Sequence, residues 1–398
     1  MIRRLILPLL LVLALPAAAQ RVISRIEVRG KVPASIVLSQ TALIEGQSYT
    51  DADLDVAVAR IRRLPFVYEA HYTVEGMTLV LHVNAMTPFY FDAEVDAAKS
   101  SIDDSSTAFF GGGARMFAGS GVVEARIRKA TGDFDSRTLG LQYSHYGIGG
   151  TRLFAIGSID WAFTNDEVAE PDPSWSVTVG YPLTIRQTLT ASVMGAGFEA
   201  ERTIEGFPRP LRRANDEQLL QLRWEYDTTE DPYFARRGLL AGIAATRREF
   251  DSTFEAGTIE RPPAQPSIIT FHNEGTNDGI AVDLQHYWPI AARGTILARA
   301  DGSFDQSDST HQQNDLPSTN SDVETEFVRL SAGYGYNFFD SGAPRESRHR
   351  AELIGSVSRM TYRQPTLSDG FDEKSLAVGY TYRRRWTTIS MRFEYAFD

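Results

Sequence analysis

Cysteine is absent from the 398-residue sequence, which excludes disulfide bonds, thiolate zinc sites and a cysteine nucleophile. Basic residues are outnumbered by acidic ones, 40 to 51, so the formal net charge is −11. Because phosphate binding needs a basic surface, we expect no nucleic acid among the partners. The mean hydropathy of −0.24 is too low for a protein with many membrane-spanning helices.

Motifs of enzymes and cofactor-binding proteins are also missing. The seven histidines form neither an H-E-x-x-H motif nor a close pair. No G-x-S-x-G elbow, Walker A loop or dinucleotide-binding G-x-G-x-x-G follows a predicted strand. We therefore expect no enzyme activity, no catalytic residue, no cofactor and no metal site.

The first nineteen residues have the pattern of a secretory signal peptide. Two arginines precede an apolar run over 5–15, and three alanines follow at 17–19. A basic start, a short apolar run and small residues at a cleavage site are typical of such signals. The run is too short for an anchor, since a spanning helix needs about 20 apolar residues. We expect residues 1–19 to be removed and the mature chain to lie outside the cytoplasm.

Residues 20–85 mix helical and strand periodicity in the order strand, helix, helix, strand, strand. The pattern predicts a strand around Ile23–Val28, helices starting at Pro33 and Asp51, and strands over 67–74 and 78–84. The second helix is expected to end before Pro65, because the residue preceding a proline disfavours helical dihedrals. These features predict a small α/β domain.

Residues 86–398 show the alternation of apolar and polar residues that strands have. A soluble β-sandwich also alternates. Three features favour a transmembrane β-barrel: segments of about 10 to 14 residues, which suit tilted transmembrane strands, aromatic residues at their ends, and connections of alternating length. Short connections are expected near 118–120, 147–150 and 184–186, and long ones at 200–216, 250–277 and 305–325.

The strand count follows from fifteen such segments, which we place between residues 88 and 397. Bacterial single-chain barrels have an even number of strands. We therefore expect a barrel of 16 strands, with 14 as the alternative. The fold class is mainly β, with the small α/β domain ahead of the barrel.

The most specific motif is "EYDTTEDPYFARRG", Glu225 to Gly238, between the eighth and ninth segments. It predicts a tight turn, since aspartate side chains accept backbone hydrogen bonds, proline fixes φ and glycine tolerates unusual dihedrals. The residues that we assign to this turn motif are Asp227, Glu230, Asp231, Pro232, Arg237 and Gly238.

The turn motif resembles the D-x-x-D/E-x-P-x-x-P-x-x-G signature of barrels in the BamA/TamA superfamily of outer-membrane assembly factors. Asp227, Glu230, Pro232 and Gly238 match it, whereas Ala235 replaces the second proline. The N-terminal segments "RIEVRGKVP", "LIEGQSYT" and "ARIRRLPFVYEAHYTVEG" resemble a polypeptide-transport-associated (POTRA) domain. The resemblance covers nearly the whole mature chain.

The resemblance implies a barrel in the outer membrane of a Gram-negative bacterium, with a POTRA-like domain in the periplasm. It also implies a role in inserting or translocating polypeptides through a lateral seam between the first and last strands. The residues expected at this seam are Phe89, Phe91 and Val95 on the first strand and Ile389, Phe393 and Phe397 on the last. The partners would be outer-membrane lipid, lipopolysaccharide and an unfolded or secreted polypeptide client.

Two departures from the superfamily leave an alternative open. The V/I-R-G-F/Y motif of its lumenal loop is missing, both at 305–325 and elsewhere. The hairpin "SLAVGYTYRRRWTTISMRFEYAFD" lies at the end of the sequence, where the family usually adds one more strand. The alternative function is a passive pore or structural barrel without insertase or export activity. In this hairpin, Arg383, Arg384 and Arg385 are expected to mark the membrane boundary.

Overall fold

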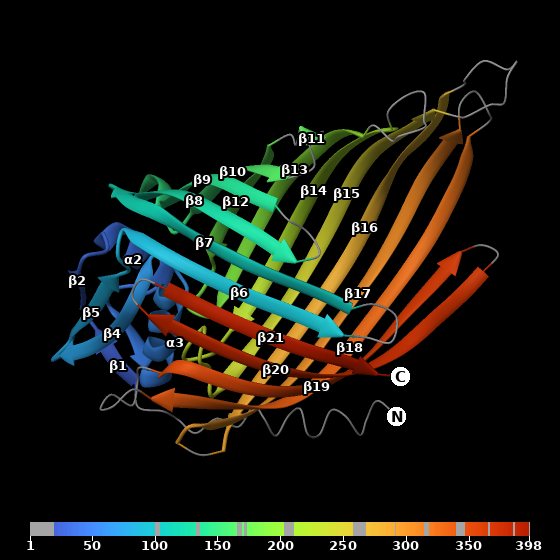
Figure 1. Ribbon diagram of the computed structural model, residues 1–398. Coiled ribbons are helices and arrows are strands. Elements are labelled where there is room, and N and C mark those ends of the chain that lie inside the picture. The colour runs from blue at the N-terminus through green and yellow to red at the C-terminus, as the bar shows by residue number, and fades with distance from the viewer. Residues whose placement is uncertain are drawn as a thin grey trace, which may run out of the picture.

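The computed structural model consists of a small N-terminal α/β module, residues 20–85, and a large β-barrel (Figure 1). The predicted signal peptide, residues 1–19, lies outside the described residues. No helix in the part of the chain that the structure describes is long and apolar enough to cross a membrane. The structure describes residues 20–99, 104–132, 136–164, 169–170, 173–202, 211–257, 268–290, 292–313, 318–339, 347–364, 367–384 and 387–397.

The module contains two helices and two small sheets. Strands β2, β5 and β4 form one sheet, in which β2 and β5 run parallel and β4 and β5 antiparallel. Strands β1 and β3 pair separately. The order β2, α2, α3, β4, β5 matches the predicted order. The elements are β1 (Gln20–Ile23), β2 (Arg25–Gly30), α2 (Ala34–Thr41), β3 (Gln47–Thr50), α3 (Asp51–Arg62), β4 (Val67–Glu75) and β5 (Thr78–Ala85).

Helix α3 positions the residues that contact the barrel. Thr50 and Asp53 form a capping box, in which each side chain binds the other's backbone N–H, and this fixes the start of the helix. Leu54 and Ile61 are buried in the module core. The helix ends at Arg62, ahead of Pro65 as predicted. Arg60, Arg62 and Arg63 therefore lie at its C-terminal end.

The barrel is a meander of antiparallel strands that closes on itself where β6 pairs with β21. A two-residue strand, β11 (Ala169–Glu170), pairs with β13 outside this meander, and a 3₁₀ turn (Ile148–Gly150) follows β9. The barrel strands are β6 (Phe89–Lys99), β7 (Asp104–Ala118), β8 (Gly121–Gly132), β9 (Ser136–Tyr146), β10 (Phe154–Thr164), β12 (Ser174–Pro182), β13 (Gln187–Arg202), β14 (Leu211–Asp227), β15 (Gly238–Gly257), β16 (Ile268–Pro289), β17 (Gly294–Gln313), β18 (Thr319–Phe339), β19 (Ser347–Gln364), β20 (Leu367–Arg384) and β21 (Thr387–Phe397).

The closed wall has fifteen strands within the described residues. The predicted count of sixteen, like the alternative of fourteen, is wrong. In a meander of fifteen, the first and last strands point the same way, and β6 and β21 accordingly pair in parallel over nine residue pairs. A parallel ladder also satisfies backbone N–H and C=O groups, although its pairing is slightly less stable per residue.

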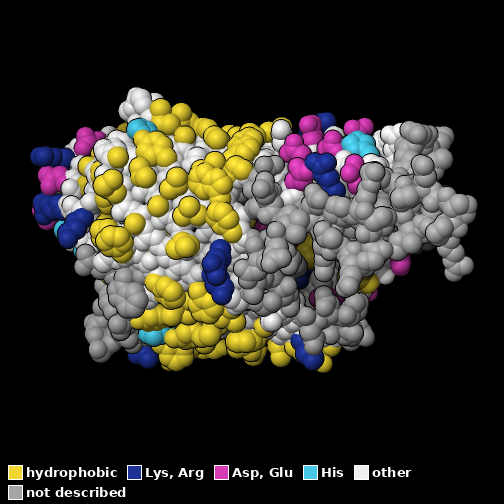
Figure 2. Space-filling model, turned by 45° about the horizontal axis from the view of Figure 1, so that its top comes forward, with side chains coloured by type: hydrophobic (Ala, Val, Ile, Leu, Met, Phe, Trp, Pro, Cys, Tyr) yellow, Lys and Arg dark blue, Asp and Glu magenta, His cyan; other side chains and the backbone are white. Residues whose placement is uncertain are grey.

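The outer face of the wall is apolar and its lumenal face is polar. Leu220 and Leu222 on β14 are 49% and 52% exposed. Successive side chains of a strand point to opposite faces, so Arg223, which follows Leu222, lies on the lumenal face. There Arg223 forms an ion pair of 2.8 Å with Asp283 on β16. Figure 2 shows hydrophobic side chains spread over much of the outer surface. This pattern is the one that a lipid-exposed barrel with a polar lumen requires.

The wall is much taller on one side than on the other. Strands β14 to β18 have between 17 and 22 residues, whereas β6, β9 and β21 have 11 each (Figure 1). The long connections expected at 250–277 and 305–325 are therefore largely strand. The expectation failed because the apolar outer face ends before the hydrogen-bonded ladder does, and the polar remainder of each strand has the composition of a loop.

The module packs into one end of the barrel (Figure 1). Its core is continuous with barrel side chains, since Phe66 makes edge-on ring contacts with Phe117 on β7 and Tyr146 on β9, at centroid distances of 5.5 and 5.7 Å. Ser35 of α2 also bonds Ser120 in the turn between β7 and β8, at 2.9 Å. The boundary expected near residue 85 thus separates two segments of the chain that share one hydrophobic core.

This shared core predicts the effect of removing the Phe66 ring. Phe66→Ala should destabilise the docked module by about 3–5 kcal/mol, because a fully buried aromatic side chain is replaced by a cavity. Pulse proteolysis of the folded protein in urea measures this as earlier cleavage within residues 20–85. Met77→Ala, which truncates an exposed side chain of the same module, is the control. Equal protection of Phe66→Ala and wild type would contradict the shared core.

Candidate functional site

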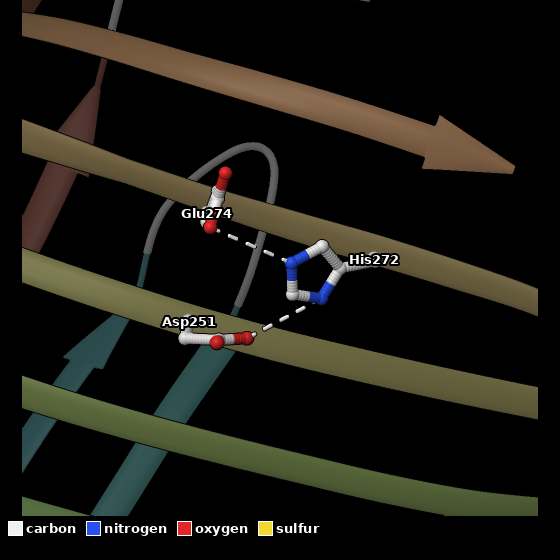
Figure 3. A group of neighbouring side chains, drawn as sticks. All are labelled: Asp251, His272 and Glu274. Atoms are coloured by element: carbon white, nitrogen blue, oxygen red, sulfur yellow. Dashed lines mark ion pairs between the residues drawn. The ribbon is translucent and has the colours of Figure 1, made fainter. Parts of the chain in front are cut away.

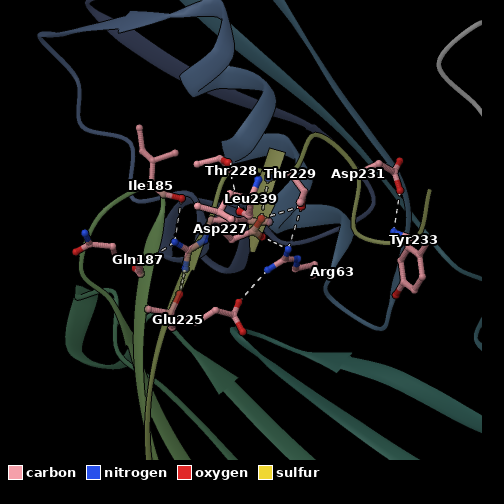
Figure 4. Close-up of polar contacts among 12 residues, drawn as sticks. Arg63, Ile185, Gln187, Glu225, Asp227, Thr228, Thr229, Asp231, Tyr233 and Leu239 are labelled. Atoms are coloured by element: carbon pink, nitrogen blue, oxygen red, sulfur yellow. Dashed lines mark hydrogen bonds and ion pairs between the residues drawn. The ribbon is translucent and has the colours of Figure 1, made fainter. Parts of the chain in front are cut away.

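The turn motif between β14 and β15 is organised by its own acidic side chains (Figure 4). Asp227, at the end of β14, accepts hydrogen bonds from the backbone N–H and the hydroxyl of Thr229, at 2.7 and 2.8 Å. Thr228 joins the two ends of the turn, because its backbone N–H donates to the carbonyl of Leu239 and its hydroxyl accepts from the N–H of Leu239, both at 2.8 Å.

The middle of the turn is held in the same way. Asp231 accepts hydrogen bonds from the backbone N–H groups of Tyr233 and Phe234, each at 2.9 Å. Glu230 accepts two more, from the N–H groups of Arg236 and Arg237, at 3.2 and 3.1 Å. Burial raises the pKa of Glu230, and the neighbouring Arg237 and these hydrogen bonds oppose that shift. Both carboxylates therefore replace the backbone pairing that an irregular segment lacks.

Two arginines of the module bind this turn. Arg63 contacts Asp227, Glu225 at 2.9 Å and Thr229 at 3.2 Å. Arg62 forms an ion pair with Asp231 at 3.2 Å, so two successive arginines at the C-terminal end of α3 bind two aspartates of the motif. A third arginine of the module, Arg60, binds a different turn.

Arg60 docks on the short connection between β12 and β13. Its guanidinium donates to the backbone carbonyls of Thr184 and Ile185, at 2.8 and 3.1 Å, and to the hydroxyl of Thr188 at 2.7 Å. Desolvation by burial, with repulsion from Arg63, lowers the pKa of Arg60 to about 10, which leaves it charged at pH 7. Next to it, Arg186 reaches back to the module and pairs with Asp53 of the α3 capping box at 2.6 Å.

The other side of the turn motif contacts the far part of the wall. The carbonyl of Phe234 accepts a hydrogen bond from Asn337 on β18 at 2.9 Å, and that of Ala235 accepts one from Arg350 on β19 at 2.7 Å. Arg350 and Asn337 also bond each other at 3.2 Å. The motif therefore lies between the module and the inner surface of the wall, and all these polar partners are buried.

Arg383 completes this arrangement. The sequence predicts it at the membrane boundary, and the structure buries its side chain. Its guanidinium donates to the carbonyl of Val67 in the module at 2.8 Å and lies 3.8 Å from the centre of the Tyr233 ring.

The structure brings the six predicted turn residues together in one segment. It also places β6 next to β21, with Phe91 opposite Thr387, Val95 opposite Met391 and Phe393 opposite Ala97. Phe89 and Phe397 lie on these strands but outside the nine paired positions. Sequence reasoning missed the partners of the turn, namely Arg62, Arg63, Asn337 and Arg350, and the docking of Arg60 on the β12–β13 connection. The only local signal was the arginine-rich "ARIRRLPF" before β4.

Gly238 yields the first prediction for this site. Its φ is +113°, and an added Cβ would lie 2.5 Å from the carbonyl oxygen of Thr228. Gly238→Val should therefore reduce the folded, heat-modifiable fraction of the barrel several-fold, measured by gel mobility with and without boiling. Gly157→Ala on β10 is the control, because a Cβ there meets only an atom 3.9 Å away. Wild-type folding of Gly238→Val would show that the strained glycine is dispensable.

The ion pair between Arg63 and Asp227 yields the second prediction for this site. Asp227 is 4% exposed, so Arg63→Met leaves a buried carboxylate without its counter-charge. We expect a loss of about 2 kcal/mol or more in module docking, measured by pulse proteolysis. Asp227→Asn in the Arg63→Met background should restore part of the loss, since it removes the unpaired charge. Strictly additive effects of the two changes would refute a direct interaction.

Comparison with known proteins finds similarity to solved structures of outer-membrane barrels. No family model and no curated protein matches the chain. BamA from Haemophilus ducreyi lacking POTRA domains 1–3 is 14% identical, with a TM-score of 0.44, over 96% of this chain and 82% of that one. The uptake receptor FyuA from Yersinia pestis is 12% identical, with a TM-score of 0.42, over 77% and 54%. CdiB from Acinetobacter baumannii is 8% identical, with a TM-score of 0.35, over 92% and 70%.

Proposed function

We propose that this protein is an outer-membrane barrel that assists the insertion or translocation of polypeptides through the seam between β6 and β21. The observation that carries the proposal is the parallel pairing at this seam. Every other pair of neighbouring strands in the described part of the wall is antiparallel.

A parallel seam favours the entry of one further strand. A strand that runs opposite to β6 and β21 pairs antiparallel with both, and antiparallel pairing is slightly more stable per residue. Once the seam opens, its unpaired N–H and C=O groups face lipid, where each costs several kcal/mol. Addition of a client strand satisfies them, in the manner of β-augmentation. The seam is not the shortest joint, since β10 and β12 share seven pairs and the seam nine.

Arg392 and Glu94, two charged side chains beside the seam, form ion pairs that do not cross it. Arg392 on β21 pairs with Glu394 of its own strand at 2.8 Å. Glu94 on β6 pairs with Arg128 on β8 at 3.0 Å, away from β21. On the outer face, the small Ala93 and Ala97 stand opposite Ile389 and Phe393 of the last strand. These contacts support a joint that depends mainly on its backbone ladder.

The module supports the same role. Its element order is that of a POTRA-like domain, and we place it on the periplasmic side, where the short connections of the barrel lie. Only residues 86–88 separate β5 from β6, and the N–H of Met86 donates to the carbonyl of Phe66 at 2.8 Å. A client that displaces the module therefore pulls directly on the first strand of the seam.

The second candidate is a structural barrel without transport activity, and the docked module favours it over an open pore. Arg60, Arg62 and Arg63 tie the module to the barrel at one end of the lumen. A barrel closed in this way conducts little until the module leaves. Outer-membrane lipid and lipopolysaccharide are then its only partners, whereas the first function adds a polypeptide client.

Locking the seam distinguishes the two functions. Cysteines at Ala93 and Ile389, which face each other across the seam, form a disulfide on oxidation, and the chain has no native cysteine to interfere. We expect the oxidised variant to reproduce the outer-membrane proteome of cells depleted of the protein, because the seam can no longer open. Reduction should restore the normal proteome.

The matched control joins two strands away from the seam. Cysteines at Leu353 and Val378 link β19 to β20, which are neighbours in the closed wall. This disulfide should leave the proteome unchanged. A locked seam with a normal proteome would eliminate lateral gating, and a normal proteome after depletion itself would favour the structural barrel.

A further inference from the structure

The tall side of the wall carries an acidic surface beyond its apolar belt. On β15 and β16 the outward positions are apolar at Ile243 and Ile280, and become charged at the facing pair Arg247 and Asp278. Alternation keeps the outward positions beyond them on this same face. Figure 2 shows acidic and histidine side chains gathered at that end of the molecule, past the hydrophobic surface.

Three metal-ligating side chains meet on this surface (Figure 3). Asp251 on β15 lies directly opposite Glu274 on β16, and His272 is two residues from Glu274 on the same face. The imidazole Nδ1 is 3.4 Å from an oxygen of Asp251, and Nε2 is 3.7 Å from an oxygen of Glu274. One ligand atom from each of the three side chains lies within 4.8 Å of the others.

The charges of this cluster are not balanced. Like charges directly opposite each other on neighbouring strands are destabilising. Among the described residues, the ion-pair contacts of Asp251 and Glu274 are with His272 alone. The nearby Arg247 is engaged with Glu249 and Asp278, at 3.2 and 3.8 Å. A cation between the two carboxylates would relieve their repulsion.

We propose that Asp251, His272 and Glu274 bind a divalent transition-metal ion, with Zn²⁺ as the probe. One imidazole nitrogen and two carboxylate oxygens form a ligand set that zinc accepts, with open positions left for water or another ligand. An imidazole favours such ions over calcium or magnesium, which prefer oxygen ligands alone. Each carboxylate now faces a different ring nitrogen, so binding turns the half-exposed ring until one nitrogen points between both oxygens.

A neighbouring hydroxyl fits this arrangement. Thr253, opposite His272 on β15, has its Oγ1 3.3 Å from the imidazole Nδ1. A hydrogen bond at one ring nitrogen orients the other toward a metal, and such supporting contacts strengthen metal sites. The bound ion would link β15 to β16 roughly 14 Å along the strands past the Arg247–Asp278 pair, given about 3.4 Å per residue. Sequence inspection predicted no metal site because the ligands come from two strands and form no local motif.

The test is Zn²⁺ binding to the full, folded chain in detergent, prepared without a histidine tag and measured by isothermal titration calorimetry. We expect one Zn²⁺ per chain, and binding weakened roughly tenfold or more by His272→Ala or by Asp251→Asn with Glu274→Gln. His311→Ala is the matched control, because His311 is an exposed histidine on neighbouring β17 whose contact is the hydroxyl of Ser309.

Two outcomes would overturn the proposal. One is that the folded wild-type chain takes up no Zn²⁺. The other is that His272→Ala and His311→Ala weaken binding equally, which would show nonspecific uptake by exposed histidines. Heat-modifiable mobility of every variant verifies that the barrel is folded, so a loss of binding reports on the cluster. Neither outcome depends on whether the seam opens.

Discussion

Asp227 is buried where β14 leaves the wall, and Arg63 of the module supplies its counter-charge. A buried carboxylate needs a partner, because an unpaired charge in the interior costs several kcal/mol. The turn motif can therefore keep its geometry only while the module is docked or while water reaches Asp227. In turn, the carbonyls of Phe234 and Ala235 hold the far wall through Asn337 and Arg350. The Arg63–Asp227 ion pair thus joins the module to the turn, which itself contacts β18 and β19.

The closure of the barrel adds a second constraint. Because the wall is a meander with fifteen strands in the described residues, its first and last strands point the same way. The resulting parallel seam is satisfied but less stable per residue than the antiparallel joints beside it. This joint is also where the chain enters the barrel from the module. The three-residue link from β5 to β6 connects the docked module directly to the first strand of the seam.

The uneven height of the wall separates two chemical environments. The short strands near the seam end close to the apolar belt, whereas β14 to β18 continue well beyond it. On these extensions outward side chains no longer meet lipid, so their composition is polar and acidic. The cluster of Asp251, His272 and Glu274 belongs to this region. Its proposed ion is therefore independent of the seam and of the module, and the two proposals stand on different parts of the structure.

Local patterns in the sequence determined the barrel class, the element order of the module and the position of the turn motif. Alternation such as that of Ile389, Met391 and Phe393 reports which face meets lipid, and the Asp227–Gly238 signature reports backbone geometry, since both depend on neighbours in the chain. Fifteen segments were also evident, but how the wall closes depends on which edges meet.

Only the tertiary structure decided the rest. The parallel pairing of β6 with β21, the docking of Arg60 and Arg63, and the burial of Arg383 join residues more than 100 positions apart. Such contacts leave no periodicity to detect. The polar ends of β15 to β18 were likewise mistaken for loops, because a backbone ladder in water requires no apolar side chains to mark it.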